Sequence, residues 1–106
     1  MTSNLPLGEQ VHIALVAAAK SASEALRLEK LAKRVMAQLM ILSDEKSVGM
    51  REATARADFK YTNAEDAWIQ AETTANIHKA EADGLKIRWE TWRTEQANTR
   101  AEMQLR

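Results

Sequence analysis

Fourteen positions in the second half of the chain repeat with an unbroken alternation of four- and three-residue steps. They are Ala57, Tyr61, Ala64, Trp68, Ala71, Ala75, His78, Ala82, Leu85, Trp89, Trp92, Gln96, Thr99 and Met103. Residues three and four apart are neighbours on a helix surface, so this spacing places all of these side chains along one face of an α-helix. The pattern predicts one long helix with a narrow seam, in which alanine is the commonest residue.

The first half of the chain carries a second seam with the same alternation. It consists of Val11, Ala14, Ala18, Ser21, Ala25, Leu28, Ala32, Val35, Leu39 and Leu42. Between the seams, the segment from Ser43 to Gly49 contains serine N-cap candidates and a glycine, which favour a turn. We therefore predict a first helix at about 7–42, a turn at about 43–47, and a second helix at about 48–105 that begins after Ser47. Together they form one domain, residues 1–106.

The predicted fold is all-α, a long antiparallel helical hairpin that resembles a coiled coil. At 1.5 Å per residue the first helix is about 55 Å long and the second close to 90 Å. With the turn centred near residue 45, the numbers of facing residues sum to roughly 90, so the first helix ends opposite Leu85. Everything from Trp89 onward then overhangs. Gly84, the only glycine beyond the first turn of the second helix, is expected to mark a kink or a close contact.

Each predicted helix also has an apolar line outside its seam. In the first helix this line contains Leu15, Ala19, Ala22, Leu26, Met36 and Met40, and in the second it contains Ile69, Thr73, Ile77, Ala80, Gly84 and Ile87. Helices with two apolar lines are usually buried between more than one neighbour. We therefore expect the hairpin to assemble into an oligomeric bundle, with the homodimer as the first choice.

The composition restricts the function more than it identifies it. Lysine and arginine total 15 residues and so do aspartate and glutamate, so no net charge draws the whole chain to nucleic acid or an anionic membrane. Cysteine is absent, which excludes thiol chemistry. The longest apolar run, residues 13–19, is too short to span a bilayer. We expect a cytoplasmic protein with no membrane contact, no cofactor, no catalytic residues and no enzymatic activity.

The end of the second helix holds the residues that we expect to bind a partner. Two of the three tryptophans lie here, on a seam with no counterpart in the first helix. Packing against a second subunit or against another protein is the favoured role for Leu85, Ile87, Trp89, Trp92 and Met103.

The same stretch is the best candidate for a nucleic-acid site. Its basic side chains outnumber its acidic ones, and aromatic rings beside arginines can stack on unpaired bases. A single-stranded nucleic-acid site would use Lys86, Arg88, Arg93 and Arg100. The simpler interpretation is that these residues form a solvated helix surface.

The two histidines suggest a third possibility. Glu9 and His12 stand one turn apart on the first helix, and His78 and Glu81 stand one turn apart on the second. In the predicted register these pairs lie at matching levels, which is how helix bundles present ligands to zinc or iron. Ordinary Glu–His pairing on the helix surface is the favoured interpretation.

The segment from Arg88 to Arg93, with the sequence Arg-Trp-Glu-Thr-Trp-Arg, and the later segment from Arg100 to Met103 close the second helix. In length, helical content and these segments the chain resembles small all-helical bacteriophage accessory proteins of the recombination and early gene region. This resemblance implies a non-enzymatic factor in the host cytoplasm that works with single-strand annealing and replication proteins or blocks a host defence complex. The chain is also similar in size to secreted helical hairpins with a Trp-x-Gly turn, but Ser47-Val48-Gly49 lacks the tryptophan.

Overall fold

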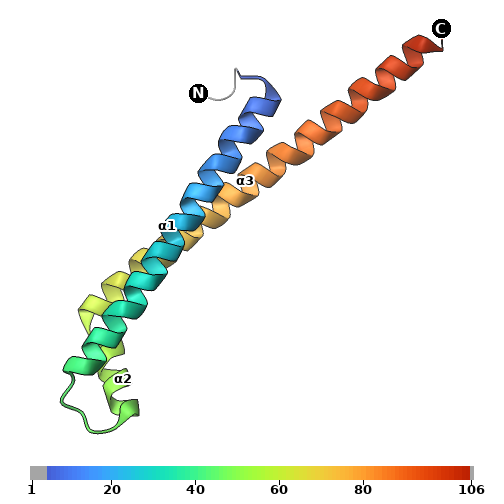
Figure 1. Ribbon diagram of the computed structural model, residues 1–106. Helices are drawn as coiled ribbons and strands as arrows, with labels where there is room; N and C mark the ends of the chain where they lie inside the picture. The colour runs from blue at the N-terminus through green and yellow to red at the C-terminus, as the bar shows by residue number, and fades with distance from the viewer. Residues whose placement is uncertain (1–4, 106) are drawn as a thin grey trace.

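The computed structural model describes residues 5–105 and contains three α-helices in that range, with no strand. Helix α1 spans Leu7–Leu42, α2 spans Val48–Ala57 and α3 spans Phe59–Gln104 (Figure 1). The all-α prediction is confirmed, and the first helix has the predicted bounds. The second predicted helix is divided in two.

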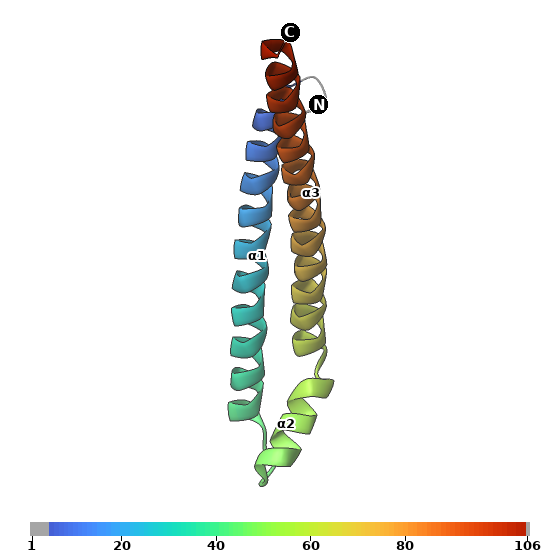
Figure 2. The same cartoon turned by 90° about the vertical axis from the view of Figure 1, so that its right-hand side faces the viewer.

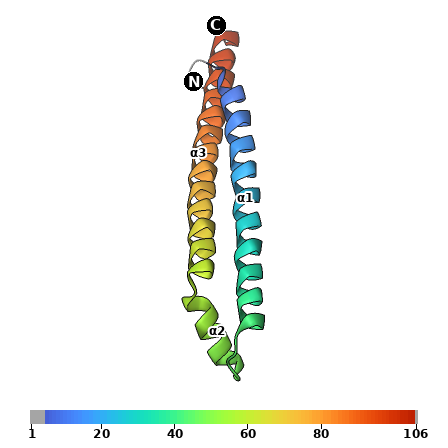
Figure 3. The same cartoon turned by 90° about the vertical axis from the view of Figure 1, so that its left-hand side faces the viewer.

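Helices α1 and α3 run antiparallel and lie side by side, as two perpendicular directions of view show (Figures 1, 2 and 3). The short α2 follows α1 and precedes α3 in the sequence. It lies at the closed end of the hairpin, where the chain turns back (Figure 2). The molecule measures 84 × 26 × 14 Å and its radius of gyration is 23.1 Å. A compact domain of this length has a radius of gyration of about 13 Å, so the chain forms a thin rod.

The prediction of one continuous helix from 48 to 105 is wrong at Asp58. The backbone there is extended, with φ −70° and ψ 136°, and the Asp58 carboxylate accepts a hydrogen bond from the backbone N–H of Lys60 at 2.8 Å. Aspartate is a strong N-cap because its side chain satisfies one of the free N–H groups of the first turn. Asp58 thus begins α3, and α2 ends one residue earlier.

The predicted turn is present, and it contains the predicted cap. Ser47 Oγ accepts a hydrogen bond from the backbone N–H of Met50 at 3.1 Å and so caps α2. Ser43 Oγ accepts from the backbone N–H of Glu45 at 3.2 Å, and Arg51 donates to the Glu45 carbonyl at 2.6 Å. These bonds are all local to the connection and the start of α2.

Gly84 does not have the expected role. Helix α3 continues without a break from Phe59 to Gln104, so no kink interrupts it at this position. A Cβ atom added to Gly84 would meet nothing within 4 Å, so no neighbouring element approaches closely.

The predicted register is also wrong, by about nine residues. Ser21 bonds to His78, whereas the predicted register placed it opposite about residue 69. At the open end, a Cβ on Gly8 would lie 3.6 Å from Trp89 Nε1, and Leu7 shares a groove with Trp92. The whole segment 43–58 acts as the connection, so the effective turn is centred near residue 50. The N-terminal end of α1 consequently lies opposite Trp92, and the overhanging part of α3 begins at Arg93.

The core is a single line of small side chains. The buried apolar residues are Val11, Ala25, Ala32, Ala55 and Ala82. All but Ala55 belong to the two predicted seams of α1 and α3, which therefore face each other. Alanine allows two helices to approach closely but gains little free energy on burial. Most of the large apolar side chains are consequently exposed rather than buried between the helices.

Candidate interaction surface

Two of the five predicted partner-binding residues lie in the contact between α1 and α3. Trp89 is half-buried against the first turn of α1, beside Gly8, and Leu85 is half-buried one turn earlier on the same seam. The guanidinium of Arg93 covers the Trp89 ring, with 4.9 Å from Cζ to the ring centroid. The expectation that Trp89 overhangs α1 is therefore wrong, because α1 extends farther along α3 than the predicted register allowed.

The other three predicted partner-binding residues are exposed. Ile87 is 63% exposed, Trp92 50% and Met103 68%. From Glu90 to Leu105 every residue of the chain is exposed. Among residues 5–105, Glu95 still shares a groove with Leu7, and α3 then continues past the start of α1, as Figure 1 shows for the red end of the ribbon.

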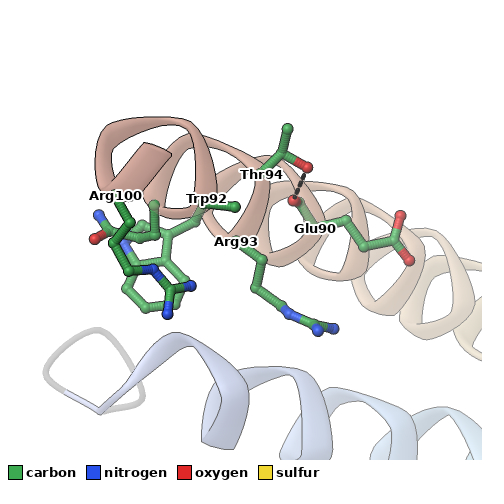
Figure 4. A pocket seen from close by; sticks show the side chains of 7 residues that line it. Glu90, Trp92, Arg93, Thr94 and Arg100 are labelled. Carbon is green, nitrogen blue, oxygen red and sulfur yellow. Dashed lines mark hydrogen bonds between the residues drawn. The ribbon is translucent and has the colours of Figure 1, made fainter. Parts of the chain in front are cut away.

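The predicted nucleic-acid residues Lys86, Arg88, Arg93 and Arg100 are all exposed. Arg93 and Arg100 line a shallow hollow together with Trp92 and Gln96. Figure 4 shows the Arg93 and Arg100 side chains reaching from α3 toward the side on which α1 begins. The basic groups are therefore accessible and, in part, grouped beside an exposed indole ring.

The four predicted metal ligands are not brought together. His78 bonds to Ser21, and His12 lies nine residues from Ser21 along α1, which corresponds to about 13 Å of helix. Glu9, His12 and Glu81 are exposed. Within residues 5–105, no three histidine, aspartate or glutamate side chains are placed to hold a metal ion. The convergence failed because it depended on the predicted register.

A polar pair that the sequence analysis did not identify joins the two helices near mid-length. Ser21 Oγ and His78 Nδ1 form a hydrogen bond within the seam. Both residues interrupt otherwise apolar stretches of their seams, and this was the signal that could have paired them. A polar pair in an apolar seam favours one register over its neighbours, because any shift leaves both groups without a partner.

The apolar surface outside the seam is divided between two faces. On α3, Ile69, Ile77 and Ile87 are 50–63% exposed, and helical spacing places their line on the side away from α1. On α1, Leu15 is 43% and Leu26 is 51% exposed. We call the α3 line, residues 69, 73, 77, 80, 84 and 87, the outer face of α3.

The α1 side of the hairpin forms a second, mixed surface. Ala22, Leu26 and Glu29 share a groove with Glu72 and Asn76 of α3. Apolar side chains of α1 therefore lie beside polar side chains of α3 on one flank of the rod.

Other polar contacts are local. Tyr61 donates a hydrogen bond to Glu65 at 2.8 Å, and this bond raises the pKa of the phenol. On the surface, the hydrogen bond from Arg27 lowers the pKa of Glu24 and raises that of Arg27 itself. The indole N–H of Trp68 is buried and has no hydrogen-bond partner in the described part of the chain.

None of the helices over residues 5–105 combines the length and the apolar character that crossing a membrane requires. No protein-family model, no curated protein and no solved structure matches the chain.

Proposed function

We propose that the chain is a non-enzymatic helical interaction protein that assembles with itself and binds another protein through its helix surfaces. The observation that carries this proposal is the amount of surface left uncovered. The chain exposes 8202 Å². A compact protein of 11.9 kDa exposes about 6,000 Å², so about 2,200 Å² of additional surface is available to partners.

The character of that surface supports the proposal. Within residues 5–105, sixteen large hydrophobic side chains are exposed, whereas Val11 is the only buried residue larger than alanine. A lone pair of helices with so small a core gains little hydrophobic free energy to offset its chain entropy. A second copy that covers part of this surface supplies the missing burial, in a coiled-coil-like bundle.

We further propose that the partner surface comprises the outer face of α3 and the exposed residues Trp92 and Met103. Exposed aromatic and long aliphatic side chains of this kind provide binding energy when a partner covers them. The resemblance to bacteriophage accessory proteins makes a replication, recombination or defence protein in the host cytoplasm the proposed target.

Sedimentation velocity over a hundredfold range of concentration tests self-assembly. We expect the mass to rise from 11.9 kDa toward at least twice that value, with helicity and thermal midpoint rising in parallel. A fully folded monomer at all concentrations would contradict the proposal.

A second candidate function is binding of single-stranded nucleic acid, and one observation favours it. Arg93, Arg100 and Trp92 line the same hollow and are exposed. Fluorescence anisotropy with a labelled oligothymidylate at 50 mM salt tests it. Three phosphate contacts by Arg88, Arg93 and Arg100 give a slope of about −2 for log affinity against log salt. The triple arginine-to-glutamine variant should abolish binding, and absence of binding by the unaltered chain would reject this function.

A further inference from the structure

A short apolar stripe on α1 has internal two-fold symmetry. It consists of Leu15, Ala19, Ala22 and Leu26, with steps of four, three and four residues. Its midpoint lies between residues 20 and 21. An antiparallel copy of α1 laid over it places Leu15 on Leu26 of the partner subunit and Ala19 on Ala22 of the partner subunit. In the resulting contact, two pairs of alanines lie at the centre and one pair of leucines lies at each end. The small central residues allow the two helices to approach closely.

The symmetry continues beyond the stripe. About the same midpoint, His12 lies level with Glu29 of the partner subunit, and Glu9 lies within one residue of the level of Lys33 of the partner subunit. His12 and Glu29 continue the surface line of the stripe at steps of three residues. The apolar centre is thus bordered by groups of complementary polarity.

A column of charges on α3 has an independent symmetry. Glu65, Glu72, Lys79, Lys86 and Arg93 follow one another at seven-residue intervals. Glu72 lines the same groove as Ala22 and Leu26, so the column lies on the same flank as the stripe. Two acids followed by three bases are complementary to their own reversed copy. About Lys79, Glu72 lies level with Lys86 of the partner subunit, and Glu65 lies level with Arg93 of the partner subunit.

The two centres of symmetry coincide. The stripe is centred between residues 20 and 21, the column is centred at Lys79, and the bond between Ser21 and His78 places these positions at one level. One two-fold axis, perpendicular to the rod, therefore satisfies both patterns. A dimer with both hairpins in the same direction would instead lay the apolar stripe on the charged column.

We propose that a second copy of this chain binds to this flank in antiparallel orientation, with the two-fold axis at the level of Ser21 and His78. The inference rests on the proposed self-assembly and specifies its geometry. The face from residue 8 to residue 33 is about 39 Å long and two helices, or about 20 Å, wide. This corresponds to about 800 Å² per subunit, the size of a standard specific interface.

The arrangement also accounts for the overhang of α3. Half-buried Met36 and Met40 continue the stripe line toward the closed end of α1. In the antiparallel dimer, Met36 and Met40 of the partner subunit extend beyond the start of α1 and lie level with residues 94–98 of α3. They cover the exposed seam next to Trp92. The only like charges that meet are Lys79 and its copy, with Asp83 one turn away on each helix.

Distances between spin labels on single-cysteine variants test the orientation, because the chain has no cysteine of its own. Lys20 and Gln38 are both exposed on the opposite flank of α1. We expect about 25 Å between labels in the Lys20→Cys dimer and about 55 to 60 Å in the Gln38→Cys dimer, since Gln38 is about 17 residues from the axis. A parallel dimer gives similar distances for the two variants and would overturn the inference while self-assembly stands.

Substitutions test the face itself by sedimentation equilibrium. Leu15→Asp should raise the dimer dissociation constant at least 100-fold, whereas Ile13→Asp, at 42% exposure against 43% for Leu15, should change it less than threefold. Glu72→Lys alone should weaken the dimer about tenfold, and adding Lys86→Glu should restore it. Equal effects at residues 13 and 15, or no restoration, would refute this interface. A chain that is monomeric throughout would refute self-assembly as well.

Discussion

The N-cap at Asp58 is expected to contribute measurably to stability, and Asp58→Ala tests this. The substitution removes the acceptor of the 2.8 Å hydrogen bond from the Lys60 N–H. Loss of an N-cap side chain costs about 1 kcal/mol, which corresponds to a fall of about 5 °C in the midpoint of a chain of this size. The Asp58 carbonyl, which accepts from the N–H groups of Tyr61 and Thr62, is unaffected.

Asp58→Asn provides the matched control. Asparagine caps a helix about as well as aspartate, so this variant should unfold within about 0.3 kcal/mol of the unaltered chain. The assay is urea unfolding followed by circular dichroism at 222 nm, at one fixed protein concentration because self-assembly shifts the apparent stability.

Two results would refute the reasoning about this break. If Asp58→Ala is as stable as Asp58→Asn, the capping bond contributes nothing. If Asp58→Ala gains helicity and stability, the chain favours a continuous second helix, and the break at this position is not intrinsic to the sequence.

Three further predictions concern single contacts. Ser21→Ala should lower the free energy of unfolding by about 1 kcal/mol in urea titrations, and adding His78→Leu should recover much of this loss because no polar group is then unpaired. Trp68→Phe should cost little stability, since the indole N–H that it removes has no hydrogen-bond partner within residues 5–105; a thermal midpoint lowered by more than about 5 °C would contradict this. Ultraviolet absorbance should show the pKa of Tyr61, the only tyrosine, raised above the ordinary value of a phenol, and closer to that value in Glu65→Ala. The stabilisation from this bond is complete below the unfolded pKa and disappears as pH rises through the folded pKa.

The helices and their seams could be predicted because they depend on local spacing. Both seams are found where the four-three alternation placed them, and Ser47 caps a helix as its position before an apolar run indicated. The break at Asp58 was missed because the seam alternation continues through Ala57 and Tyr61 without a change of phase. Periodicity alone does not distinguish a helix that continues from one that stops and restarts, and in the structure the seam position Ala57 is exposed whereas Ala55 is the buried residue of α2.

The error in register followed from that omission. With a turn confined to 43–47, the residue numbers of two facing residues should sum to about 90. Because the connection also includes α2, each residue of α1 instead faces a residue of α3 about nine positions later in the chain. The metal hypothesis and the assignment of Trp89 to the overhang both depended on the smaller sum. Predictions that depended on local exposure are less sensitive to register, and Ile87, Trp92 and Met103 are exposed as the partner-binding prediction requires.

The position of the outer face of α3, opposite the contact with α1, has a consequence for the kind of target that the chain selects. In the proposed dimer the two copies of α3 lie along one edge, so Ile77 and Ile87 appear there twice, in opposite directions. A target with a single binding groove would fill one copy and leave the other free. A target that is itself two-fold symmetric would engage both at once, and its second contact would benefit from the high effective concentration created by the first. The edge therefore selects targets by their symmetry as well as by their chemistry.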